Sequence, residues 1–174
     1  GVVTIILSEA DSVHREQLRK IMSEPYRTLL GHFRHEIGHY YWPLVEKLKS
    51  TNEYRMLFGD ERTDYGEALK EYYEKGAPIN WQDNFISKYA SAHSWEDWAE
   101  TWAHYFHLMD TLETANALNL AFADKNEFHV APDPYTVRDF NSIYEDSVRL
   151  MGATNSLNRS MGLPDIYPFI ITKN

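Results

Sequence analysis

The segment His35-Glu36-Ile37-Gly38-His39 places two histidines four residues apart, which puts both side chains on one face of a helix. Two imidazoles on one face can bind a single ion, at about 2.0 to 2.1 Å from each nitrogen. Glu36 lies beside that face, where a carboxylate can take a proton from water that a metal has made more acidic. Gly38 is unfavourable inside a helix and is expected to let a neighbouring element pack closely. The fold must therefore contain this helix and bring a further ligand to it.

Composition restricts what the further ligand can be. The sequence of 174 residues has no cysteine, so disulfides, thiolate ligands and cysteine nucleophiles are excluded within it, and a metal must be bound by His, Asp and Glu. Apolar residues make up 43% and aromatic residues 14%, which is enough for a sizeable core. We therefore expect one compact domain over residues 1–174.

Charge and hydropathy bear on partners and location. Lys and Arg number 17 against 26 for Asp and Glu, a net charge of -9 without a basic run, so no nucleic-acid partner is expected. The longest apolar run, residues 2–7, is too short to cross a bilayer, so no membrane association is expected. These features predict a soluble, cytoplasmic protein and leave its oligomeric state open.

Helices dominate the predicted secondary structure. Residues 2–7 are rich in β-branched side chains and are predicted to form one strand. Pro43 is expected to kink or end the helix that carries the two histidines, and Ser94 is expected to cap a later one. Residues 50–84 are expected to be a long, partly ordered excursion that contains one short helix and shapes one wall of a cleft. Helices are predicted at residues 11–23, 25–42, 67–74, 94–109, 110–123 and 135–155.

The predicted fold class is mainly α with a minor β element (α+β), with the histidine-bearing helix packed against a second, glutamate-bearing helix. That second helix carries Glu96 and Glu100, four residues apart among several tryptophans. Carboxylates on a largely buried helix need partners. One could bind the metal and the other could hold a ligand histidine in its tautomer.

These two segments carry a resemblance to a known family. The histidine segment and residues 89–100 resemble the lethal-factor-like small gluzincins, which share the HExxH zincin motif. Over most of its length the sequence resembles the bacterial putative zinc-binding metallopeptidase family, whose members often have an N-terminal zinc-ribbon segment that would be absent here. The resemblance implies a zincin-like metallopeptidase domain, an enzyme that hydrolyses peptide bonds in a peptide or protein substrate with one Zn²⁺ per chain.

The resemblance also implies roles for individual residues. Glu36 would be the general base, and Tyr89, seven residues before the third ligand, would stabilise the oxyanion. Glu100 would orient His35. The implied zinc ligands are His35, His39 and Glu96.

Other side chains near these segments are weaker candidates. His93 is expected either to reach the substrate or the metal, or to make a local hydrogen bond. His104 is expected to be a core histidine with its hydrogen bonds satisfied, and His32 to line the cleft. Tyr65 and Tyr105 are alternative phenols with an expected structural role.

Two other classes of protein compete with the peptidase. A di-iron or di-manganese helical protein also uses Glu-x-x-His, which Glu36 and His39 form, but it needs a second such unit and the sequence has none. A non-catalytic zinc-binding module for regulation or interaction would not need a free carboxylate such as Glu36 beside the metal.

Overall fold

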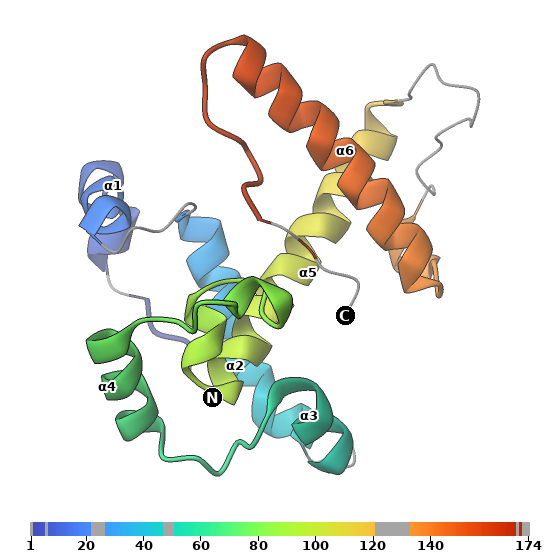
Figure 1. Cartoon of the computed structure of the whole chain (residues 1–174). Coiled ribbons are helices and arrows are strands. Elements are labelled where there is room, and N and C mark those ends of the chain that lie inside the picture. The colour runs from blue at the N-terminus through green and yellow to red at the C-terminus, as the bar shows by residue number, and fades with distance from the viewer. Residues whose placement is uncertain are drawn as a thin grey trace. The chain divides into compact units, whose positions relative to one another are not determined.

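The computed structural model describes residues 2–5, 7–21, 27–46, 51–120, 133–169 and 171 (Figure 1). Within these residues the secondary structure is entirely helical, with six α-helices and four 3₁₀ helices. The chain divides into two compact units: unit 1 is Gly1–His104 with Phe169–Asn174, and unit 2 is Tyr105–Pro168. In chain order the elements are η1 (Leu7–Ala10), α1 (Ser12–Ile21), α2 (Leu29–Glu46), α3 (Thr51–Phe58), α4 (Tyr65–Lys75), η2 (Trp81–Asp83), η3 (Tyr89–Ala92), α5 (Ser94–Ala117), η4 (Pro134–Thr136) and α6 (Phe140–Ser160).

An aromatic cluster packs the elements of unit 1 that surround the two histidines. The rings of Trp42 on α2 and Tyr54 on α3 are both buried, with centroids 3.9 Å apart. Trp98 on α5 lies 5.8 Å from Trp42 and 5.5 Å from Phe58. The hydroxyl of Tyr54 also donates to the backbone carbonyl of Ser94 at 2.8 Å. The cluster therefore fixes the start of α5 against α2 and α3.

At Gly38, α2 and α5 approach each other closely. A Cβ atom at this position would lie 3.0 Å from the Cα atom of Ala99 and 3.1 Å from the Cβ atom of Trp102. The indole N–H of Trp98 donates to the carbonyl of Gly38 at 2.9 Å. The close packing expected beside this glycine is confirmed, and so is the packing of the histidine-bearing helix against the glutamate-bearing one.

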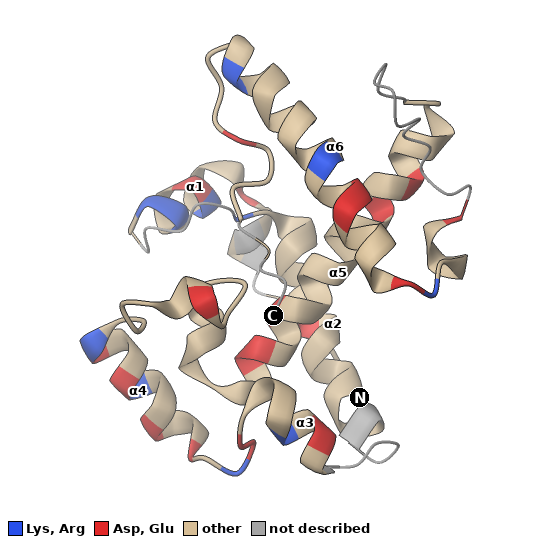
Figure 2. Ribbon diagram, turned by 45° about the vertical axis from the view of Figure 1, so that its right-hand side comes forward, with Lys and Arg blue, Asp and Glu red and all other residues tan. Residues whose placement is uncertain are grey.

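Helix α4 is defined by its two ends and carries charges of both signs (Figure 2). The Asp64 side chain accepts from the backbone N–H of Glu67 at 2.8 Å, which satisfies one unpaired donor of the first turn. Gly76 follows the helix with a φ of 78°, a conformation that favours glycine. Exposed Lys–Glu pairs four residues apart, such as Lys75 with Glu71, lie along the helix.

Unit 2 has its own core. The part of α5 from Tyr105 onward, η4 and α6 belong to it. The side chain of Asn155 on α6 holds the segment that follows, donating to the carbonyl of Tyr167 at 2.8 Å and accepting from its N–H at 3.0 Å. The buried core residues are Met109, Leu112, Ala115, Ile143 and Leu150. No helix in the described part of the chain is long and apolar enough to cross a membrane.

The predicted strand at residues 2–7 is wrong. Residues 2–5 have no regular secondary structure, Leu7–Ala10 form η1, and residue 6 lies outside the described residues. A strand needs a neighbouring strand to complete its backbone hydrogen bonds, and no other described segment is a strand. The described residues are therefore all-α, without the minor β element.

Several helix boundaries also differ from the prediction. Helix α2 continues through Pro43 to Glu46, beyond the predicted end at residue 42. The proline removes one helical hydrogen bond, which the helix tolerates here, and the neighbouring Trp42 is buried. The two helices predicted at 94–109 and 110–123 are one helix, α5, which ends at Ala117; residues 121–123 lie outside the described part. The excursion at 50–84 is more ordered than predicted, since it contains α3, α4 and η2.

Candidate metal centre

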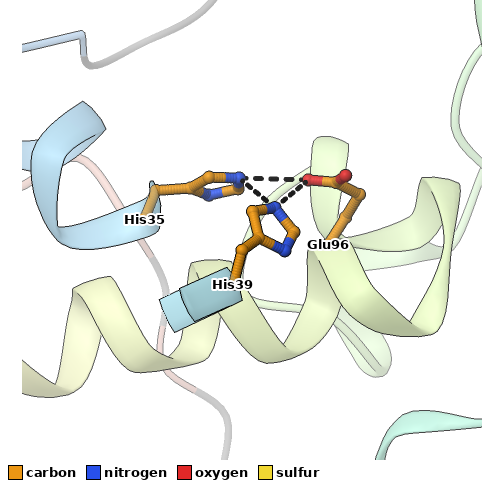
Figure 3. A group of neighbouring side chains, drawn as sticks. All are labelled: His35, His39 and Glu96. Atoms are coloured by element: carbon orange, nitrogen blue, oxygen red, sulfur yellow. Dashed lines mark hydrogen bonds and ion pairs between the residues drawn. The ribbon is translucent and has the colours of Figure 1, made fainter. Parts of the chain in front are cut away.

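Three side chains from two helices converge on one point in unit 1 (Figure 3). Helix α2 supplies His35 and His39, one turn apart, and the first turn of α5 supplies Glu96. The Nε2 atoms of the two histidines are 3.0 Å apart. The Oε2 atom of Glu96 lies 3.1 Å from Nε2 of His35 and 3.4 Å from Nε2 of His39. The two helices therefore bring two imidazoles and a carboxylate together, as a mononuclear site requires.

The protonation state of these groups favours a cation at this point. The Nδ1 atom of His35 lies 2.7 Å from Oε1 of Glu100, and a carboxylate accepts, so Nδ1 carries a hydrogen and Nε2 is the ring atom that could bind a metal. Glu96 is only 1% exposed, and its Oε2 atom has no hydrogen-bond partner. A buried carboxylate oxygen that faces two imidazole nitrogens is stabilised by a positive charge between them. Two imidazoles and a carboxylate are a donor set that fits zinc.

The pKa values of His35 and Glu96 also indicate that a positive charge is stabilised at this point. Burial opposes a charge on His35, but the carboxylates of Glu100 and Glu96 outweigh it and raise its pKa to about 10. Burial also opposes a charge on Glu96, but His35, His39 and Tyr65 hold its pKa well below the usual value. Without a metal, a proton on His35 therefore supplies the charge that the cluster requires.

Glu36 lies next to the cluster and faces a pocket. Its side chain is 32% exposed, and its Oε1 atom lies 3.6 Å from Nε2 of His32, too far for a hydrogen bond. The pocket has a volume of about 460 Å³. Besides Glu36 and His39, it is lined by Tyr40, Pro43, Leu44 and residues 2–4. A carboxylate that is not committed to the three-residue cluster and is open to solvent can exchange protons with a bound molecule.

Two tyrosines approach the cluster in different ways. The ring of Tyr89 lies 6.1 Å from the ring of His35, and burial and the charge of Glu96 raise the pKa of its phenol, so it stays a hydrogen-bond donor. The hydroxyl of Tyr65 donates directly to Oε1 of Glu96 at 2.6 Å. The structure thus gives Tyr65 a contact with the cluster beyond the structural role expected of it. The role of Tyr89 stays a prediction.

Glu100 connects the cluster to a residue that the sequence did not single out. One oxygen of Glu100 accepts from His35 and the other accepts from the hydroxyl of Ser87 at 2.6 Å; the orienting role of Glu100 stays a prediction. Ser87 is buried and also accepts from the backbone N–H of Ala90 at 3.1 Å. Ser87 lies between helices, where no helical spacing in the sequence could have indicated its contact with Glu100. A hydroxyl shortly before a buried Glu-x-x-x-Glu helix is the one hint that the sequence contains.

His93 caps α5. Its Nδ1 atom accepts from the backbone N–H of Trp95 at 3.1 Å, and its Nε2 atom donates to the carbonyl of Thr63 at 3.1 Å. The buried hydroxyl of Ser94 has no hydrogen-bond partner, so the predicted cap at Ser94 is replaced by His93. This is the local hydrogen-bond role considered for His93 from the sequence; contact with a substrate stays a prediction.

His104 is buried in unit 1 and lies apart from the three ligand atoms. Its ring packs edge-on against Phe169, with centroids 4.2 Å apart, and burial lowers its pKa to about 4. Among the described residues, His35, His39 and Glu96 form the one group of three or more acidic or imidazole side chains that could hold a metal.

Comparisons of the sequence with known proteins also point to a zinc site. A family model described as "Putative zinc-binding metallo-peptidase" matches residues 1–174. The chain is 49% identical over 175 residues to uncharacterized protein Mb2598c of Mycobacterium bovis and to uncharacterized protein Rv2568c of Mycobacterium tuberculosis. Each match covers 98% of this chain and 50% of the relative, so the chain spans half the length of these relatives. No solved structure matches the chain.

Proposed function

Because the chain belongs to the family described as "Putative zinc-binding metallo-peptidase", we propose that it is a gluzincin-type peptidase domain that uses one zinc ion to hydrolyse peptide bonds. The observation that carries the proposal is the convergence of His35, His39 and Glu96, in which a buried oxygen of Glu96 makes no hydrogen bond and faces the two imidazoles. The proposed substrate is a peptide or protein.

Each neighbouring side chain has a proposed part in the reaction. Zinc held by the three residues would supply Lewis acidity and a water of lowered pKa. Glu36, beside the cluster and open to the pocket, takes the proton of the attacking water and passes it to the leaving amine. Tyr89 donates a hydrogen bond to the oxyanion of the substrate. Glu100 keeps the Nε2 lone pair of His35 directed at the cluster.

The first prediction separates metal binding from proton transfer. Glu36→Gln should keep one zinc per chain and lower peptide cleavage by about 10²- to 10⁴-fold, because the amide cannot accept the proton. Glu96→Ala should lose the zinc, because it removes the ligand from the second helix. Zinc content and cleavage of a broad peptide library are measured on the same samples. Glu53→Gln, an exposed change on α3, serves as the matched control.

Three outcomes would contradict parts of the proposal. Full activity of Glu36→Gln would refute the role of this residue as general base. A wild-type protein that holds zinc and cleaves no peptide in the library would favour the non-catalytic module. Two iron ions per chain would favour the dinuclear helical protein.

A further inference from the structure

Each of the two carboxylates beside the histidines is held by a hydroxyl on the oxygen that faces away from them. The Oε2 atom of Glu96 points at the histidines, and its Oε1 atom accepts from the hydroxyl of Tyr65 at 2.6 Å. Glu100 repeats the arrangement, with Oε1 on His35 and Oε2 on the hydroxyl of Ser87. The hydroxyls come from the segment between α3 and α5, so this segment fixes the orientation of both carboxylates.

Tyr65 is itself held in place. It is the first residue of α4, whose start is fixed by the side chain of Asp64. Its ring packs against two others, with centroids 5.2 Å from His93 and 5.6 Å from Trp95, and those two rings contact each other at 5.1 Å. Both ring nitrogens of His93 make hydrogen bonds with backbone groups. The phenol is therefore directed at Glu96 by packing that does not depend on the cluster.

We propose that Tyr65 is a positioning residue that restricts Glu96 to binding the cation through Oε2 alone. This inference rests on the proposed function. A carboxylate can bind a cation through one oxygen or both. The hydrogen bond from Tyr65 occupies Oε1 and stabilises the orientation in which Oε2 faces the histidines. Binding through one oxygen leaves a coordination position open for water and substrate, which a catalytic zinc site requires.

The second prediction concerns Tyr65→Phe, which removes the hydroxyl and keeps the ring. The zinc dissociation constant, measured by competition with a chromogenic chelator, should rise by about 10- to 100-fold. The protein loaded with cobalt(II) should absorb visible light more weakly, because the released Oε1 atom raises the coordination number from four towards five. Neither readout depends on peptidase activity.

Two further variants test how specific this effect is. Tyr41→Phe makes the same change on α2, where the ring stacks on Trp102, and should leave affinity and spectrum unchanged. Ser87→Ala removes the hydroxyl from Glu100, and it should weaken zinc binding while keeping the wild-type cobalt spectrum, because Glu96 is untouched.

Failure of the inference and failure of the proposed function give different results. Wild-type affinity and spectrum in Tyr65→Phe would overturn the inference alone. A zinc-loaded wild-type protein that cleaves no peptide would overturn the proposed function, while the change in spectrum would still support the role of Tyr65 in positioning Glu96. A crystal structure of the zinc-loaded wild-type protein provides a test that does not depend on the folding of any variant. Glu96 bound through both oxygens would overturn the inference.

Discussion

Two histidines of unit 1, the partly buried His35 and the buried His104, show how the surroundings of a side chain decide its charge. His35 faces the carboxylates of Glu96 and Glu100, which raise its pKa to about 10 against the effect of burial. His104 packs against Phe169, and burial lowers its pKa to about 4. At neutral pH and without a metal, the first ring is therefore charged and the second is neutral.

The third prediction concerns the stability of the metal-free protein in acid. The pKa of His104 is about 4 in the folded state and about 6.5 in an unfolded chain, so between these values the unfolded chain binds more protons. The free energy of unfolding should fall as the pH drops through this window, by on the order of 3 kcal/mol in total from this group. Above about pH 6.5 the contribution is constant.

Urea unfolding of wild type and His104→Gln, with a chelator present, measures this contribution between pH 4 and pH 8. The variant should show a smaller dependence on pH in the acid window, because glutamine does not titrate. Groups common to both proteins, such as Asp97, whose pKa burial and the charge of Glu100 raise to about 7, affect both curves alike. Parallel curves would refute the assignment.

Among the elements, the contact between α2 and α5 determines the position of the ligands. Histidines from one helix meet a glutamate from the other because Gly38 lets the helices approach to the distance of backbone contact. The carbonyl of Gly38 also accepts a hydrogen bond from the indole N–H of Trp98. Spacing along each helix sets which side chains face the cluster, and the glycine sets how far apart they are.

The fourth prediction tests this contact with Gly38→Ala. The added methyl group would meet the Cα atom of Ala99 at 3.0 Å, and overpacking of this kind costs about 1 to 3 kcal/mol, more than the gain in helix propensity of about 1 kcal/mol. We expect lower stability in chemical unfolding and weaker zinc binding. Gly152→Ala in α6, where a Cβ atom meets nothing within 4 Å, should be neutral or stabilising. Equal effects in the two variants would contradict this account.

The sequence predicted those parts of the site that depend on helical spacing. The interval of four residues put His35 and His39 on one face, and the aromatic residues around Glu96 indicated a buried partner helix; the structure brings all three together. Tyr65 and Ser87 reach the carboxylates from a helix start and from a loop. Their contacts depend on tertiary packing, which no periodic pattern records.

The errors in secondary structure have a similar cause. The β-branched residues 2–7 suit a strand, but propensity cannot supply a partner strand, and the described part of the chain contains none. Pro43 was expected to kink or end its helix; α2 does not end there but continues to Glu46, although the proline removes one helical hydrogen bond, and the neighbouring Trp42 is buried. Local preference decided neither place: the first lacks a tertiary partner, and in the second the helix continues past a residue that is unfavourable within it.

At the scale of the whole molecule, the proposed metal ligands belong to one compact unit, and the other unit has its own core. All three proposed ligands lie in unit 1, while unit 2 has a separate core around Met109 and Leu112. A family model covers the whole chain, and the expectation of one domain over residues 1–174 stays a prediction. Changes in the core of unit 2 should affect stability without altering the ligands.

The fifth prediction tests this division with Leu112→Ala. Leu112 is 1% exposed, and removal of a fully buried leucine side chain typically destabilises a protein by about 2 to 5 kcal/mol. Calorimetry should show a lower melting temperature, while zinc content stays at one ion per chain. A folded variant that loses its zinc would show that the ligands in unit 1 depend on the core of unit 2.

The position of the ligands on α2 and α5 also has an effect on chain entropy. An ion held by His39 and Glu96 joins two points far apart in the sequence and closes the intervening chain into a loop. In a sequence without cysteine it takes the place of a covalent cross-link. Unlike a disulfide, such an ion closes the loop only while it stays bound, so the stabilisation depends on the affinity of the site for the ion. The ion proposed for the chemistry would thus also protect unit 1 against proteolysis.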